Sequence, residues 1–281
     1  MLDKDIHQLR KRLQLSVIID CLRPISFRGK ARLLSRWLPA GGVREAKVFG
    51  YRVSLDLKDY IQRMMYLGAF ERQETAIVKR RLQSGATFVD VGANAGYFSL
   101  LASRLVGAKG RILAFEPSSY VADLLDTTIQ RNQIENIQLF RFALGKENAQ
   151  RVLSDVLPDN HSPTFFMPGS GPAVGIRLLD DVLVQTQTEC VDLMKIDVEG
   201  FELEVLSGAE KSIKEGRIKA VLIEFNERWL RAAETSPQEL HKWLTDRGFR
   251  SKGPPPLADG ALVNCLYVHN APLKCGKNEV A

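Results

Sequence analysis

From residue 86 onwards, short apolar runs alternate with segments in which apolar residues recur every three to four positions. The short runs predict strands, and the periodic segments predict helices. Nearly every position of the predicted strands is apolar, which is typical of a parallel sheet covered by helices on both faces. The predicted strands are 86–91, 110–116, 136–143, 191–197, 218–225 and 261–269, and the predicted helices are 97–106, 119–132, 202–215 and 237–247.

The sequence also marks several boundaries of these elements. Residues 236–239 match a capping box with proline at the first helical position. Gly216 and Gly248 stand where a left-handed residue commonly ends a helix. The last strand follows a short segment around Phe249, so we expect it to pair antiparallel as part of a terminal hairpin.

The first part of the chain follows a different pattern. Apolar residues recur with helical spacing in residues 1–40, residues 46–57 alternate like a hairpin around Gly50, and residues 58–84 are helical again. We therefore expect a basic helical arm and hairpin over residues 1–55, followed by an α/β domain over residues 56–270. A C-terminal tail covers 271–281.

Residues 144–190 interrupt the alternation of strands and helices. Within them, the segment 154–177 contains four prolines and three glycines. Long irregular insertions in compact domains are usually binding loops or lids. We expect this one to act as a substrate lid over the carboxyl edge of the sheet, where such sheets bind their ligands.

Charge is distributed unevenly along the 281 residues. The net charge is +6, yet residues 1–52 hold 12 Lys and Arg against 4 Asp and Glu, and the rest of the chain is near neutral. A near-neutral body argues against a nucleic-acid-binding domain, which usually carries a basic face. The four cysteines lie far apart without a C-x-x-C pair, so we expect reduced thiols and a cytoplasmic protein.

The turn after the first predicted strand of the α/β domain indicates which cofactor it binds. Gly92 and Gly96 allow a tight turn and let a ligand approach the backbone at a helix N-terminus. A dinucleotide site would need a third glycine where Asn94 stands. Asp90 would repel a pyrophosphate but suits a cation, such as the sulfonium and amine of S-adenosylmethionine. Glu116, at the end of the next strand, is placed to accept hydrogen bonds from a ribose diol.

The run that follows residue 190 carries the candidate chemistry. Lys195, Asp197 and Glu199 alternate around the end of an apolar strand, which places them on one face. Gly200 then allows the chain to turn into the next helix. A purely structural interpretation stays open: Lys195 pairs with a carboxylate, and Glu199 favours the helix N-terminus through the helix dipole.

These motifs resemble the FkbM-type methyltransferases, over roughly residues 56–227. The resemblance implies a class I, S-adenosylmethionine-dependent enzyme with a Rossmann-like sheet of seven strands, the last one antiparallel. It also implies O-methylation of a hydroxyl on a saccharide or a secondary metabolite. The strings that carry the resemblance, in order, are FVDVGANAGYFSLLAS, ILAFEP, NIQLFRFALG, LLDDVL, VDLMKIDVEGFELEVLSGAE and VLIEFNE.

The resemblance also implies a role for each matching residue. The cofactor's methionine part is expected to lie against the first glycine turn, its ribose against the next strand end, and its adenine against the backbone after the third strand. The residues against the methionine part are Asp90, Gly92, Asn94 and Gly96; the ribose residue is Glu116; and the adenine residues are Phe142 and Ala143. Asp197 is expected beside the reacting methyl group and Glu199 on the acceptor side. Glu71 and Glu224 are expected to close the pocket.

An alcohol acceptor needs a base, and three side chains are candidates. Asp197 is the first choice if burial raises its pKa, and Glu199 is second because a helix N-terminus would lower its pKa. His161, in the lid, has the best intrinsic pKa, about 6.5. A divalent metal held by Asp197 and Glu224 is an alternative that we do not expect, because no third ligand is obvious.

Three other functions compete with this interpretation. An NAD-dependent oxidoreductase is disfavoured by Asn94 and Asp90, and a non-catalytic binding scaffold would not need Asp197. A nucleic-acid methyltransferase that uses an N-P-P-aromatic motif is disfavoured, because this chain does not have that motif after its fourth strand. The basic arm of residues 1–40 packs on the catalytic domain or on a second subunit, or it lies on an anionic membrane.

Overall fold

The computed structural model describes residues 38, 41–153, 172–255, 260 and 262–270. The chain divides into two units, Met1–Arg72 and Gln73–Ala281. The basic arm, the C-terminal tail, most of the predicted lid and His161 lie outside the described residues.

The first unit contains the predicted hairpin. Strands β1 (Val43–Val48) and β2 (Tyr51–Asp56) pair antiparallel around a turn at Phe49 and Gly50, both with positive φ. Helix α3 (Tyr60–Leu67) follows, and its capping residue Asp59 accepts the backbone N–H of Gln62 at 2.8 Å. The single helix predicted over 58–84 is instead two helices. The first, α3, ends at Gly68 in a left-handed conformation, and the second is α4 (Arg72–Arg81).

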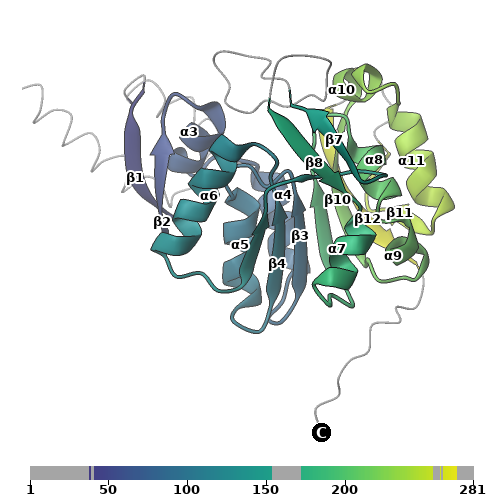
Figure 1. Ribbon diagram of the computed structural model, residues 1–281, viewed down its shortest axis with the longest axis horizontal. Coiled ribbons are helices and arrows are strands. Elements are labelled where there is room, and N and C mark those ends of the chain that lie inside the picture. The colour runs from purple at the N-terminus through teal and green to yellow at the C-terminus, as the bar shows by residue number, and fades with distance from the viewer. Residues whose placement is uncertain (1–37, 39–40, 154–171, 256–259, 261, 271–281) are drawn as a thin grey trace, which may run out of the picture. The chain divides into compact units, whose positions relative to one another are not determined.

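The second unit is built on a seven-stranded sheet in the order β11-β12-β10-β9-β3-β4-β5 (Figure 1). Five neighbouring strands run parallel, and β12 runs antiparallel to both of its neighbours. This confirms the predicted fold class, including the terminal hairpin. The strands are β3 (Thr87–Val91), β4 (Arg111–Phe115), β5 (Ile137–Phe140), β9 (Leu193–Ile196), β10 (Ala220–Asn226), β11 (Phe249–Ser251) and β12 (Leu262–His269).

Helices of this unit account for the apolar character of the strands. One face of the sheet packs in a large buried cluster with residues from α7, α8, α9, α10 and α11, and α5 contacts β3 and β4. The predicted capping box is present, since Ser236 Oγ accepts the backbone N–H of Glu239 at 3.2 Å. The helices are α5 (Tyr97–Val106), α6 (Ser119–Arg131), α7 (Leu179–Gln185), α8 (Glu202–Ser207), α9 (Glu210–Lys214), α10 (Glu227–Ala232) and α11 (Pro237–Asp246).

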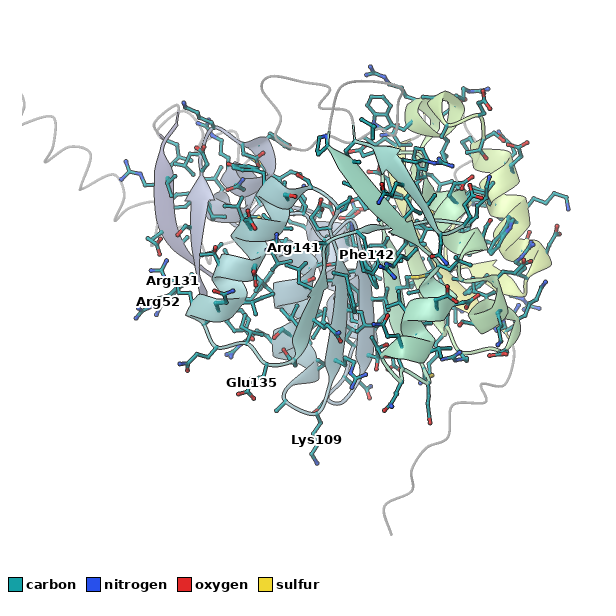
Figure 2. All side chains as sticks on the ribbon, viewed as in Figure 1. Arg52, Lys109, Arg131, Glu135, Arg141 and Phe142 are labelled. Atoms are coloured by element: carbon teal, nitrogen blue, oxygen red, sulfur yellow. The ribbon has the colours of Figure 1, made fainter. Side chains whose placement is uncertain are left out.

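The segment after β5 differs from the prediction. The strand predicted over 136–143 is broken at Arg141 and Phe142, which Figure 2 labels, and Arg141 turns outward to pair with Asp123 and Asp126. The supposedly irregular insertion contains a second, three-stranded sheet in its described part. Its strands are β6 (Ala143–Leu144), β7 (Ala149–Val152) and β8 (Ala173–Arg177), in the order β6-β8-β7.

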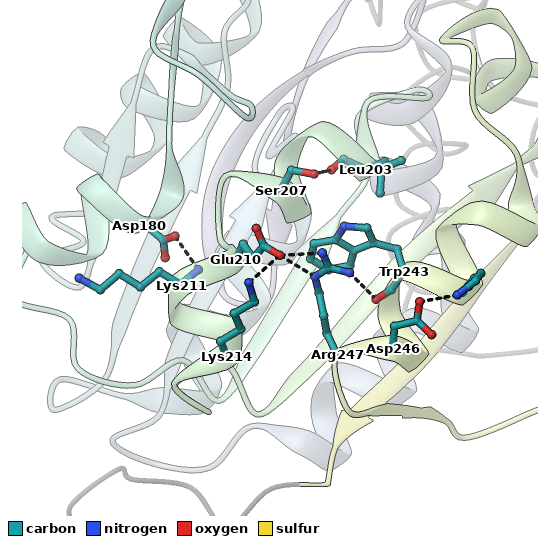
Figure 3. A network of polar contacts seen from close by, with 10 residues as sticks. Asp180, Leu203, Ser207, Glu210, Lys211, Lys214, Trp243, Asp246 and Arg247 are labelled. Carbon is teal, nitrogen blue, oxygen red and sulfur yellow. Dashed lines mark hydrogen bonds and ion pairs between the residues drawn. The ribbon is translucent and has the colours of Figure 1, made fainter.

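The helix predicted over 202–215 is also divided in two. It breaks at Gly208, where a Cβ would lie 2.0 Å from the backbone oxygen of Gly145. The second piece, α9, is fixed by polar contacts that Figure 3 shows: Glu210 accepts from Arg247, the residue that follows α11, at 2.6 Å. Asp180 of α7 accepts the backbone N–H of Lys211 at 2.9 Å. These contacts tie three helices together on one side of the sheet.

Two further expectations concern the environment of the protein. Cys190 is disulfide-bonded, so the expectation of four reduced thiols is wrong for this residue, whereas Cys265 is a free, buried thiol. No helix in the described ranges is long and apolar enough to cross a membrane.

Candidate active site

A row of polar side chains crosses one face of the sheet near its carboxyl edge. Asp90 of β3 lies opposite Lys195 of β9, and Lys195 lies opposite Leu222 of β10. Directly paired residues point to the same face, and alternation puts Glu224, two positions after Leu222, on that face too. Glu224 pairs in turn with Asn264 of β12. The alternate residues of these strands, such as Val89 and Met194, belong to the large buried cluster on the other face of the sheet. The polar row therefore lies on the face opposite that cluster.

The turn after β3 is shaped by contact with the turn after β9. Gly92 has φ +82, and its N–H donates to the Phe115 carbonyl at 3.0 Å. A Cβ at Gly92 would lie 1.9 Å from the backbone oxygen of Asp197. A Cβ at Gly96 would lie 2.3 Å from Leu125. Neighbouring protein atoms therefore already exclude side chains at these two glycines, and the expected contact with a ligand stays a prediction.

Glu116 holds the same turn from the end of β4. Its Oε2 accepts the backbone N–H of Asn94 at 2.9 Å, and its Oε1 accepts that of Ser118 at 2.9 Å. Asn94 has φ +50, the left-handed conformation that asparagine tolerates. Burial raises the pKa of Glu116 to about 7, although both hydrogen bonds act to lower it. Each carboxyl oxygen keeps a second lone pair, which suits a ribose diol.

Asp90 and Lys195 form the buried centre of the row. Ser99 of α5 donates its hydroxyl to Asp90 at 2.6 Å, and burial raises the pKa of Asp90 while Lys195 opposes the rise. Lys195 is 2% exposed, and its Nζ lies 2.7 Å from Asp197 Oδ2 and 4.7 Å from the centroid of the Phe98 ring. The structural alternative for Lys195, that it pairs with a carboxylate, is thus confirmed.

Glu199 sits on a strained turn between β9 and α8. It has φ +52, and Gly200 beside it has φ +103. Burial, followed by the charge of Asp197, raises the pKa of Glu199 to about 7. The expectation that a helix N-terminus lowers this pKa is wrong, because α8 starts at Glu202 and burial has the larger effect.

Two residues that sequence reasoning gave little or no weight belong to this group. Burial and the charges of Asp197 and Glu199 raise the pKa of Glu224 to about 9. Glu202 is 1% exposed, burial raises its pKa to about 7, and its Oε1 accepts the N–H of Gly200 at 3.1 Å. A carboxylate at the start of an amphipathic helix is ordinarily solvated, so only the preceding glycine hinted at the burial of Glu202.

The remaining predicted residues have different placements. Phe142 follows the carboxyl end of β5, where its ring contacts Phe115 and Phe140, and Arg177 lies over it at 5.2 Å. Ala143 is buried in β6. Glu71 belongs to the first unit, so its part in the pocket stays a prediction. Within the described part of the chain, no group of three His, Cys, Asp or Glu side chains is placed to hold a metal ion.

This cluster of buried acids is expected to make stability depend on pH. The folded protein holds these protons more tightly than the unfolded chain, whose glutamates titrate near 4.5. The free energy of unfolding should therefore fall as pH rises from about 4.5 to about 7. Urea unfolding of the wild type and of Glu202→Gln, at pH 5 and pH 8, tests this. Between pH 5 and pH 8, the free energy of unfolding of the wild type should fall by about 2–3 kcal/mol more than that of the variant. Equal decreases would contradict a raised pKa for Glu202.

The arrangement of fold and carboxylates fits one kind of cofactor. Asp90 and the Asp197 turn offer negative charge to a cation, Glu116 offers acceptors to a diol, and Gly92 is closed by backbone rather than open to a pyrophosphate. These are the requirements of S-adenosylmethionine. The fold and the site define the class: this is a Rossmann-like, S-adenosylmethionine-dependent methyltransferase.

Comparison with known proteins gives the family. Residues 90–251 match the model of the methyltransferase FkbM domain, and the chain belongs to that family. It is 27% identical over 201 residues to methyltransferase sdnD of Sordaria araneosa, covering 60% of this chain and 75% of the relative. It is 33% identical over 144 residues to "Probable cobalt-precorrin-6B C(15)-methyltransferase (decarboxylating)" of Sulfolobus acidocaldarius, covering 47% and 70%.

A solved structure is similar at lower identity. It is Aeropyrum pernix fibrillarin in complex with natively bound S-adenosyl-L-methionine, with TM-score 0.44 and 17% identity over 82% of this chain and 84% of that one.

Proposed function

We propose that the enzyme transfers the methyl group to a hydroxyl, on a saccharide or a secondary metabolite. The observation that carries this proposal is Glu199, a carboxyl whose pKa is raised to about 7. Its turn touches the cofactor turn, because the backbone oxygen of Asp197 fills the space beside Gly92. A base whose pKa lies near neutral pH is efficient at removing a hydroxyl proton during the transfer.

Each residue of the two turns has a proposed role. Asp90, Gly92, Asn94 and Gly96 form the wall against the methionine part of the cofactor, and Glu116 accepts from its ribose. The backbone at Phe142 and Ala143 borders the adenine. Glu224 keeps its proton at neutral pH, because its pKa is about 9, and so can donate a hydrogen bond to an acceptor oxygen.

The proposed reaction depends mainly on orientation and on one proton transfer. The cofactor supplies an electrophilic methyl group, and the two turns hold it and the acceptor in line, an alignment that can be worth about 7–11 kcal/mol. Glu199 takes the hydroxyl proton on its carboxylate as the acceptor oxygen bonds to the methyl carbon; the carbon–sulfur bond breaks, and the sulfur leaves as a neutral thioether. Asp197, held by Lys195 at 2.7 Å, presents negative charge beside the cofactor cation.

This assignment exchanges the two bases that the sequence ranked. Asp197 is engaged in an ion pair with the buried ammonium of Lys195 at 2.7 Å, so we assign its carboxylate to that pair rather than to the proton transfer. Glu199 forms no ion pair with any of the residues that the structure describes, and it is partly buried. His161 lies outside the described residues and stays a prediction, as do membrane contact or a second subunit through residues 1–40.

The first experiment separates cofactor binding from acceptor choice. Calorimetry should show micromolar binding of S-adenosylmethionine, about −8 kcal/mol, and no binding of NAD at the same concentrations. Transfer of a labelled methyl group is then followed to sugar alcohols, nucleotide sugars and polyketide hydroxyls, with an RNA as comparison. Label on a hydroxyl compound supports the proposal. Label found only on RNA, or on carbon or nitrogen, would refute O-methylation of a small acceptor.

Asp197→Asn is expected to destabilise the protein as well as slow it. The amide carries no charge, so Lys195, which is 2% exposed, loses its ion pair at a cost of about 2 kcal/mol. Turnover should fall about tenfold while the dependence on Glu199 is retained. Urea unfolding checks the stability. The matched control is Asp123→Asn, which removes an exposed partner of Arg141 and should cost less than about 1 kcal/mol.

A further inference from the structure

Glu202 is buried beneath the turn that carries the proposed base. It is the first residue of α8 and is 1% exposed. Its Oε1 accepts two backbone N–H groups, from Gly200 at 3.1 Å and from Val198 at 3.3 Å. Its Oε2 is buried and has no hydrogen-bond partner among the described residues. One carboxyl group thus clamps both sides of Glu199.

The clamped turn is one that does not form without support. Glu199 and Gly200 both have positive φ, at +52 and +103, and a non-glycine residue adopts this conformation only when its surroundings impose it. A Cβ at Gly200 would lie 2.4 Å from the Trp229 backbone oxygen, so α10 blocks the turn on one side. The backbone bond from the Phe201 N–H to the Val198 oxygen is 3.3 Å, which is long.

From this geometry we propose that Glu202 is a positioning residue for methyl transfer. By accepting the amides of Val198 and Gly200, it fixes the turn in the form that keeps Glu199 partly buried and ready to take the acceptor's proton. This inference rests on the proposed role of Glu199. It assigns Glu202 no contact with cofactor or acceptor.

Glu204 makes it possible to separate positioning from simple packing. It lies in the first turn of the same helix, two residues further on, and its partner is Lys146 at 2.8 Å on the surface. Glu204→Gln therefore makes the same chemical change on α8 without touching the turn. Glu202→Gln keeps one carbonyl acceptor for the two amides, whereas Glu202→Met has a similar length and no acceptor.

The test is a carbon-13 NMR titration of the Glu199 carboxyl in the full chain, assigned by its loss in Glu199→Gln. A purely structural role of Glu202 would lower the melting temperature and leave this titration unchanged. We expect the wild type, Glu204→Gln and Glu202→Gln to titrate at about the same pH. In Glu202→Met the turn relaxes and Glu199 reaches water, so its midpoint should fall by at least about one pH unit.

Three outcomes would overturn the inference. The first is an unchanged Glu199 midpoint in folded Glu202→Met. The second is a midpoint in Glu202→Gln as low as in Glu202→Met, since the retained carbonyl would then have no effect. If Glu202→Met does not fold, Glu202→Asp replaces it, because the shorter carboxylate does not reach both amides. The third outcome is an unchanged Glu199 midpoint in Glu202→Asp. Failure of the wild type to bind S-adenosylmethionine would count against the proposed function and leave the titration result standing.

Discussion

Alanine at Gly92 is expected to destabilise the protein by about 2–5 kcal/mol and to weaken S-adenosylmethionine binding at least tenfold. Its φ of +82 costs a residue with a side chain about 1–2 kcal/mol. The new Cβ would also lie 1.9 Å from the Asp197 backbone oxygen, and forced overpacking adds about 1–3 kcal/mol. The turn at Gly92 and the turn that carries Glu199 must then separate. This moves the residues assigned to contact the cofactor away from the proposed base. Urea unfolding and calorimetry measure the two effects.

Gly85→Ala is the matched control for this substitution. Gly85 has the same φ, +82, but nothing lies within 4 Å of a Cβ built there. It should show only the conformational cost of about 1–2 kcal/mol, with unchanged cofactor affinity. If the two variants lose equal stability, the contact between the turns contributes nothing and the close approach at Gly92 is irrelevant. Wild-type cofactor affinity in Gly92→Ala would contradict the proposed coupling.

The fold was largely predictable because its signals are local. The apolar strands from 86 onwards and the capping box at 236–239 each reflect neighbouring residues, and the structure contains them, with the strand over 136–143 shortened to Ile137–Phe140. What failed depended on distant contacts. At the break between α8 and α9, Gly208 packs against the backbone of Gly145, far away in sequence, and no periodicity in the helix reveals that contact. The strands around residues 143–177 pair across an insertion whose prolines and glycines suggested only a loop.

The candidate site was predictable in its residue types but not in its electrostatics. The alternation of Lys195, Asp197 and Glu199 showed which side chains would share the strand end. It did not show that Lys195 would choose Asp197, nor that burial would raise the pKa of Glu199 to about 7. Both depend on how closely neighbouring turns pack. The position of the glycines was correct, but a side chain at Gly92 is excluded by the backbone of another turn, and one at Gly96 by the Leu125 side chain.

Glu199→Gln is expected to lower turnover by about 10²–10⁴-fold without loss of fold. The amide keeps the size and the turn but accepts no proton, so the hydroxyl must react without a base. Cofactor affinity should stay within about threefold, because Glu116 and Asp90 are untouched. Glu204→Gln, on the nearby helix surface, is the control and should retain wild-type turnover. Rates of labelled methyl transfer at saturating cofactor give the comparison.

The pH profile then identifies the base. Glu199 works only when ionised, and burial raises its pKa to about 7, so wild-type turnover should fall about tenfold per pH unit below that value. Glu224, with a pKa of about 9, stays protonated throughout this range and cannot replace it. Glu199→Gln should therefore show a flat profile between pH 5.5 and 7.5, an interval of about two units around the titration. A profile in the variant that still bends near pH 7 would assign the bend to another group, and Glu116 and Glu202, whose pKa values burial also raises to about 7, are examined first, together with His161.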